Sequence, residues 1–156
     1  MTKPPAFEDE FVAALRKLFE ERIAFNRVIG LHVDLITADG VEGSLAMRDD
    51  LIGHDLHKRL HGGVISATLD AMAGLAIMAA IGARHMDETP MQRMHRFVKI
   101  GTIDLRVDYL RQAIGEQFTF RAEVLRLGSR VATARMEFKG SDGGLLATGA
   151  AAYIVS

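Results

Sequence analysis

The residues from Gly62 to Ala83 form an almost unbroken apolar run, and this run constrains the fold more than any other segment. From Val64 to Ala83 the only polar side chains belong to Ser66, Thr68 and Asp70. A helix that is apolar on every side must be enclosed on nearly all of them. An unpaired ionised Asp in such surroundings costs on the order of several kcal/mol. We therefore expect Asp70 to have a specific role.

The apolar run is long enough to cross a membrane, since about 20 apolar residues span a bilayer. A charge at its middle, Asp70, and the small residues Ala71, Ala73 and Gly74 argue against this interpretation. Neither end carries the Trp or Tyr typical of membrane interfaces. The pattern therefore predicts a central core helix over 62–83, with no membrane partner.

Composition indicates one globular domain over residues 1–156, with 49% hydrophobic and 25% charged residues. The formal net charge of −1 gives no electrostatic footprint for nucleic acid, which is not an expected partner. Cysteine is absent, which excludes disulfides and thiolate nucleophiles and fits a reducing compartment. The first residues, Met1 to Pro5, lack the pattern of a signal peptide. We expect a cytoplasmic protein.

The rest of the chain predicts one more helix and six strands. Apolar residues at helical spacing over 6–28 predict an amphipathic helix within an N-terminal region, 1–28. Residues 31–36 and 41–47 flank a turn and predict a hairpin. Four strands follow, at about 102–110, 118–124, 132–138 and 145–155. Short turns join them, so the order predicts an α+β fold with an antiparallel sheet wrapped around the central helix.

Alternation identifies the inner face of each later strand. In the first of them, Ile103, Leu105, Val107 and Tyr109 alternate with polar residues and are expected to face the core. The same alternation recurs in the next two strands, at Phe118, Phe120, Ala122 and Val124 and at Ala132, Ala134, Met136 and Phe138.

His61-Gly62-Gly63 stands at the start of the apolar helix, with Asp70 nine residues after the histidine. Together with the strand from Gly101 to Leu110, this pattern resembles the hotdog-fold thioesterases, particularly the PaaI-type acyl-CoA thioesterases. The likeness extends from about Gly30 to Val155. It implies a hotdog fold and hydrolysis of an acyl-CoA thioester to a carboxylic acid and free CoA, without a cofactor or a metal.

The residues themselves suggest a chemistry. Gly62 and Gly63 leave backbone N–H groups uncovered by side chains at the positive end of a helix dipole, as an oxyanion hole requires. Asp70 can act either as a nucleophile on the thioester carbonyl or as the base that activates water. Sequence does not decide between these two routes.

The spacing of Gly62 and Asp70 predicts a site shared between two subunits. Eight residues along a helix separate them by about 12 Å, whereas both must come within about 3.5 Å of groups on one carbonyl. The site should therefore combine Gly62 of one copy with Asp70 of another, in a homodimer. The resemblance implies paired sites at a subunit interface and a homotetramer as the larger assembly.

The resemblance assigns further residues one by one. His61 matches the family histidine before the oxyanion glycine, and Thr102 lies where relatives have a Ser or Thr near the catalytic carboxylate. His54 stands where the family commonly has Asn, which leaves its role in substrate binding open. CoA phosphates need cations, for which Arg111, Arg126 and Arg130 are candidates. The resemblance places Gly128 and Ser129 in a turn beside the pantetheine and nucleotide.

Three alternatives stay open. His54, His57 and His61 could hold zinc, although no acidic residue except Asp55 is identifiable to orient them. A hotdog 3-hydroxyacyl dehydratase would use a His and a carboxylate for proton transfer, but Gly-Gly after His61 favours hydrolysis. A non-catalytic acyl-CoA-binding protein would hold the ligand without turning it over.

Overall fold

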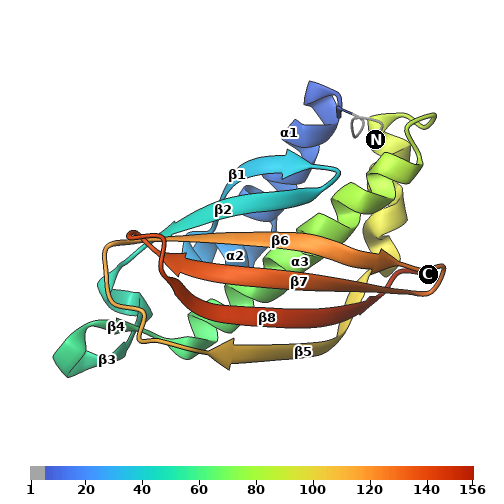
Figure 1. Ribbon diagram of the computed structural model, residues 1–156. Coiled ribbons are helices and arrows are strands. Elements are labelled where there is room, and N and C mark those ends of the chain that lie inside the picture. The colour runs from blue at the N-terminus through green and yellow to red at the C-terminus, as the bar shows by residue number, and fades with distance from the viewer. Residues whose placement is uncertain (1–5) are drawn as a thin grey trace.

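A six-stranded antiparallel sheet wraps around one long helix, α3 (Gly62–Arg84), as Figure 1 shows. The computed structural model describes residues 6–156. The strand order is β1-β2-β6-β7-β8-β5. The six strands are β1 (His32–Thr37), β2 (Gly40–Ala46), β5 (Gly101–Tyr109), β6 (Gln117–Leu127), β7 (Val131–Gly140) and β8 (Leu145–Ile154). The predicted α+β hotdog architecture is confirmed.

Helix α3 is mostly buried in the fold, as its apolar sequence predicts, and part of its surface is half-buried. Leu69, Met72, Leu75 and Ile77 are all 0% exposed. The helix is long and apolar enough to cross a membrane, but 61% of its most apolar stretch is buried inside the fold. The burial of its side chains supplies much of the core, at about 25 cal/mol per Å² of apolar surface removed from water.

The inner face of the sheet follows the predicted alternation. Phe118, Phe120 and Ala122 of β6 are buried, as are Ala132, Ala134, Met136 and Phe138 of β7. On the outer face, cross-strand ion pairs join Arg121 to Glu42 and Arg135 to Glu123. These exposed charges leave the outer face of β2, β6 and β7 facing water.

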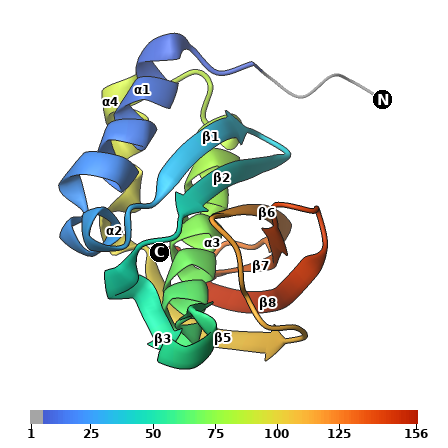
Figure 2. The ribbon, with the colours of Figure 1, turned by 90° about the vertical axis from the view of Figure 1, so that its left-hand side faces the viewer.

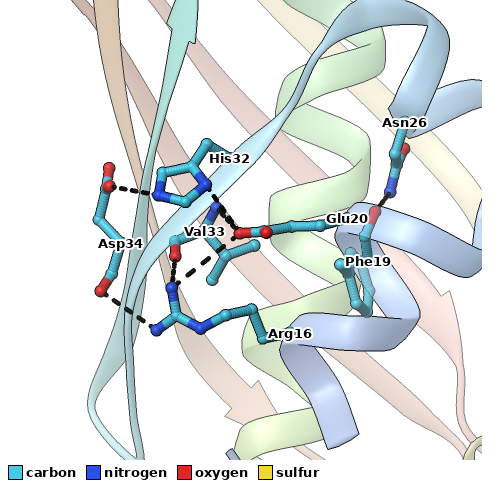
Figure 3. A network of polar contacts seen from close by, with 7 residues as sticks. All are labelled: Arg16, Phe19, Glu20, Asn26, His32, Val33 and Asp34. Atoms are coloured by element: carbon cyan, nitrogen blue, oxygen red, sulfur yellow. Dashed lines mark hydrogen bonds and ion pairs between the residues drawn. The ribbon is translucent and has the colours of Figure 1, made fainter. Parts of the chain in front are cut away.

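The N-terminal region is helical but not one continuous helix. It comprises α1 (Asp9–Lys17), a π-helical turn (Leu18–Arg22) and α2 (Ala24–Ile29). Ile23 is extended, with φ −77° and ψ 103°, which interrupts the helix. The side-chain amide of Asn26 donates to the Phe19 carbonyl oxygen at 3.0 Å and compensates for the interruption (Figure 3). Residues 1–5 of the predicted N-terminal region lie outside the described residues.

The π-helical turn is tied to β1 by polar contacts (Figure 3). The backbone N–H of Val33 donates to Glu20 Oε1 at 2.7 Å, and His32 Nδ1 lies 3.0 Å from the same oxygen. Arg16 donates to the Val33 carbonyl oxygen. Glu20 thus satisfies an N–H group of β1, which is an edge strand of the sheet.

Two small elements lie in stretches where the sequence analysis expects no regular structure. The first is α4 (Pro90–His95), whose Thr89 and Gln92 form a capping box. This Thr-x-x-Gln spacing is a helix-start signal that the sequence analysis missed. The second is a two-stranded sheet of β3 (Ile52–His54) and β4 (Arg59–Leu60), beside the start of α3. Single 3₁₀ turns span Asp49–Leu51, Asp55–His57 and Arg96–Lys99.

A buried arginine holds α4 against α1, which lie together on one side of α3 in Figure 2. Arg93 is 0% exposed, and its guanidinium lies 4.2 Å from the centroid of the Phe11 ring. Arg93 Nη2 donates to Glu8 Oε2 at 2.5 Å. This hydrogen bond lowers the pKa of Glu8 below its ordinary value of 4.5.

Candidate functional site

Asp70 lies where α3, β5 and β8 meet. Thr102 of β5 donates from Oγ1 to Asp70 Oδ1 at 2.9 Å. The Tyr153 hydroxyl of β8 lies 2.5 Å from the same oxygen. Two hydroxyl groups therefore lie at hydrogen-bond distance from one carboxylate oxygen on an otherwise apolar helix. The expected proximity of Thr102 and Asp70 is therefore observed, whereas the sequence analysis missed Tyr153.

A β-bulge turns Thr102 toward α3. Thr102 pairs with Tyr153, and the register then shifts so that Asp104 pairs with Ala152. Directly opposite residues of an antiparallel pair share a face, so Thr102 lies on the inner face with Tyr153. The prediction that Ile103 faces the core is wrong, because the shift leaves it 57% exposed. A bulge re-aims side chains in this way.

Tyr153 stays protonated in the folded protein. Burial of the phenol, which is 4% exposed, is the main cause, and the hydrogen bond to Asp70 is the second. Together they raise the pKa of Tyr153 far above its ordinary value of 10.0. The hydroxyl is therefore a permanent donor near neutral pH.

His61 caps the start of α3 with its side chain. Its Nδ1 accepts from the backbone N–H of Gly63 at 2.8 Å. The prediction of two uncovered N–H groups is thus wrong for Gly63. A Cβ added to Gly63 would lie 2.9 Å from His61 Nδ1, so the glycine makes room for the imidazole. The N–H of Gly62 has no acceptor within residues 6–156.

A cavity of about 440 Å³ opens beside Gly62. The Tyr109 hydroxyl donates to the Gly62 carbonyl oxygen at 2.8 Å and forms part of its wall. Arg111, expected to bind substrate, lines the same cavity. Space, one free N–H donor and a cation therefore lie together at the N-terminal end of α3.

His54 does not join the other histidines in a metal site. Its ring stacks on His57 with the ring centroids 5.1 Å apart, and its buried Nδ1 has no partner within residues 6–156. His61 is turned toward Gly63 instead. No three His, Cys, Asp or Glu side chains among residues 6–156 are placed to hold a metal ion together. The zinc alternative thus has no arrangement of ligands to support it.

The remaining predicted substrate residues lie at the other end of α3. Gly128 and Ser129 line a cavity of about 510 Å³, whereas the exposed Arg130 is not among its lining residues. The basic side chains of this cavity were not among the predicted substrate residues, although all lie in one stretch from the end of α3 to the start of β5: Arg84, His85, His95, Arg96 and Lys99. Arg96 pairs with Glu88, and this hydrogen bond lowers the pKa of Glu88.

Comparison with known proteins identifies similar chains. The family model "Thioesterase superfamily" matches residues 57–147. The "Medium/long-chain acyl-CoA thioesterase YigI" of Escherichia coli strain K12 is 34% identical over 139 residues, which cover 89% of this chain and 90% of that protein.

Two solved structures are similar throughout. A crystal structure from Shewanella oneidensis, described as related to the thioesterase superfamily, has a TM-score of 0.88 and 36% identity, covering 94% of this chain and 96% of that one. A crystal structure from Syntrophus aciditrophicus has a TM-score of 0.83 and 33% identity, covering 95% and 97%.

Proposed function

This chain belongs to the thioesterase superfamily and is a thioester hydrolase, and we propose that it hydrolyses an acyl-CoA to a carboxylic acid and free CoA with Asp70 at the reacting centre. One observation carries the assignment of Asp70. It is a carboxylate within the apolar helix α3, and two hydroxyl groups hold one of its oxygens at hydrogen-bond distance. A carboxylate held in this way is suited to attack on a carbonyl carbon or to proton transfer. The PaaI-type assignment stays a prediction.

Two routes satisfy the chemistry. As a general base, Asp70 takes a proton from water while the water oxygen attacks the thioester carbonyl carbon, and the CoA thiolate leaves and is protonated. As a nucleophile, Asp70 displaces the thiolate to form an anhydride, which water then hydrolyses. Both routes consume one water and need no cofactor. In each, the Gly62 N–H would stabilise the negative charge that develops on the carbonyl oxygen.

We propose that the working unit is a homodimer. Gly62 and Asp70 lie on one continuous helix, about 12 Å apart along its axis, so one chain cannot bring both to the same carbonyl. β5 is an edge strand, and an unpaired edge is a template for another strand. Three large apolar side chains on or just after β5 are more than half exposed: Ile103, Tyr109 and Leu110. A second copy paired along β5 would cover them.

The proposed dimers can pair further into the expected homotetramer. The outer face of β2, β6 and β7 is unsuited to that contact because exposed ion pairs cover it. We therefore propose that a tetramer leaves this face in water.

We propose that the phosphates of CoA bind in the cationic cavity at the C-terminal end of α3, with Gly128 and Ser129. Arg84 is about 21 Å from Asp70 along the helix axis but about 33 Å from Gly62. A CoA whose thioester lies at Asp70 can therefore extend toward this cavity along the same subunit. Arg111, beside Gly62, then serves the acyl end or the partner's substrate.

Incubation with a panel of acyl-CoAs tests the function, with acyl chains from short to long because one relative is named for medium and long chains. Release of free thiol, lost in Asp70→Asn, is the expected result. Loss of water without thiol release would identify a 3-hydroxyacyl dehydratase. Retention of intact ligand would identify a binding protein.

A further inference from the structure

Tyr153 has no role in the proposed reaction so far, yet it makes the closest polar contacts of Asp70. Its hydroxyl oxygen lies 2.5 Å from Asp70 Oδ1 and 2.5 Å from the carbonyl oxygen of the same residue. The phenol has one hydrogen, which these two oxygens share, and it is 4% exposed, so bulk water does not compete for it. The contact joins residues 83 positions apart in the chain.

We propose that Tyr153 is a positioning residue, which fixes Asp70 Oδ1 together with Thr102 and leaves Oδ2 as the oxygen that reacts. This inference rests on the proposed function of Asp70. Oδ1 receives the Thr102 hydroxyl at 2.9 Å and the Tyr153 hydroxyl at 2.5 Å. Oδ2 has no hydrogen-bond partner within residues 6–156. The two oxygens of the carboxylate are therefore not equivalent.

This asymmetry limits how the carboxylate of Asp70 can turn. An Asp side chain on a helix can otherwise turn about its last torsion, because terminal sp³–sp² torsions have broad minima. Two donors from different strands, β5 and β8, hold the carboxylate plane. Reaction with a thioester requires alignment to within a fraction of an ångström and about 10–20°. The contact with Asp70 also contributes to the raised pKa of the Tyr153 phenol.

The test is Tyr153→Phe, which keeps the buried ring and removes only the hydroxyl. We expect kcat for acyl-CoA hydrolysis to fall between about tenfold and a hundredfold, because a hydrogen bond to a charged group is lost. KM should change by less than about threefold.

Thr68→Val is the matched control. Thr68 lies on α3 two residues before Asp70, is 0% exposed, and its Oγ1 has no hydrogen-bond partner within residues 6–156. The substitution therefore removes a buried hydroxyl group from the same helix and leaves the contacts of the Asp70 carboxylate unchanged. Its kcat and KM should match those of the wild type.

A double-mutant cycle with Thr102→Val separates positioning from packing. Both hydroxyl groups act on one oxygen of Asp70. The fall in kcat of the double variant should therefore differ from the product of the falls in the two single variants. An unchanged kcat in Tyr153→Phe, or independent losses in the cycle, would overturn the positioning role. That result would leave the proposed function intact, whereas absence of thiol release by the wild type would remove the function itself.

Discussion

A complementation experiment between two inactive variants tests the shared site directly. The first variant is Asp70→Asn. The second is Gly62→Pro, which deletes the proposed oxyanion donor without disturbing the helix. Proline is favoured at the first position of a helix, which Gly62 occupies. His61 before it is extended, with φ −64° and ψ 133°, the conformation that a following proline requires.

The expected activities follow from the geometry of α3. Loss of an oxyanion donor costs about 10²–10³-fold in kcat, so each variant alone is close to inactive. In a random mixture, half of the subunits carry an intact Asp70 and the other half an intact Gly62. A site that takes one group from each subunit is then intact in about one quarter of cases. The mixture should therefore regain about one quarter of wild-type activity.

The assay is thiol release from an acyl-CoA by the two variants co-expressed with different affinity tags. Co-purification of both tags verifies that mixed assemblies form. Gly62→Ala is the matched control, since it keeps the N–H and its Cβ would lie an ordinary 3.4 Å from the Tyr109 ring. It should retain activity within a few-fold. Mixed assemblies without recovered activity would refute the shared site, because a site within one chain is inactive in both variants.

Four further outcomes are expected. Asp70→Asn should lower kcat by at least about a thousandfold while gel filtration and ligand binding are unchanged. Arg93→Ala should destabilise the fold by about 2–4 kcal/mol in urea through the cavity it leaves, whereas Arg93→Met, which fills the space without a buried charge, should stay within about 1 kcal/mol.

The hydrogen bond from Arg96 lowers the pKa of Glu88 below 4.5. The contribution of Glu88 to stability is therefore present above pH 4.5 and is lost as the pH falls through the lowered pKa. Glu88→Gln should flatten the dependence of the urea midpoint on pH in the acid range. The pKa of Tyr153 is raised, so the contribution of the buried, neutral phenol to stability is present below pH 10.0 and is lost as the pH rises further. Tyrosinate absorbance at about pH 11 should therefore be equal in folded wild type and folded Tyr153→Phe, with a difference appearing only on unfolding.

Much of the fold could be predicted because its signals are local. The apolar run that becomes α3 and the alternation of Phe118 and Phe120 in β6 report burial within a few residues. The short turns between the later strands exclude crossovers, which determines an antiparallel sheet. Asp70 could be singled out because a charge within an apolar helix is costly wherever the helix packs. The start of α4 could have been predicted in the same way, because the capping box at Thr89 is a local signal.

The sequence by itself therefore determined the central helix, the six strands of the main sheet, their order along the chain and the identity of the unusual carboxylate. Only the tertiary structure decided what surrounds that carboxylate. Thr102 reaches Asp70 across 32 positions of sequence because of a bulge, and Tyr153 reaches it across 83. The capture of the Gly63 N–H by His61 depends on a side-chain rotamer. Periodicity records which face of an element is buried, but long-range contacts depend on register and bulges, which shift a side chain between faces by a single residue.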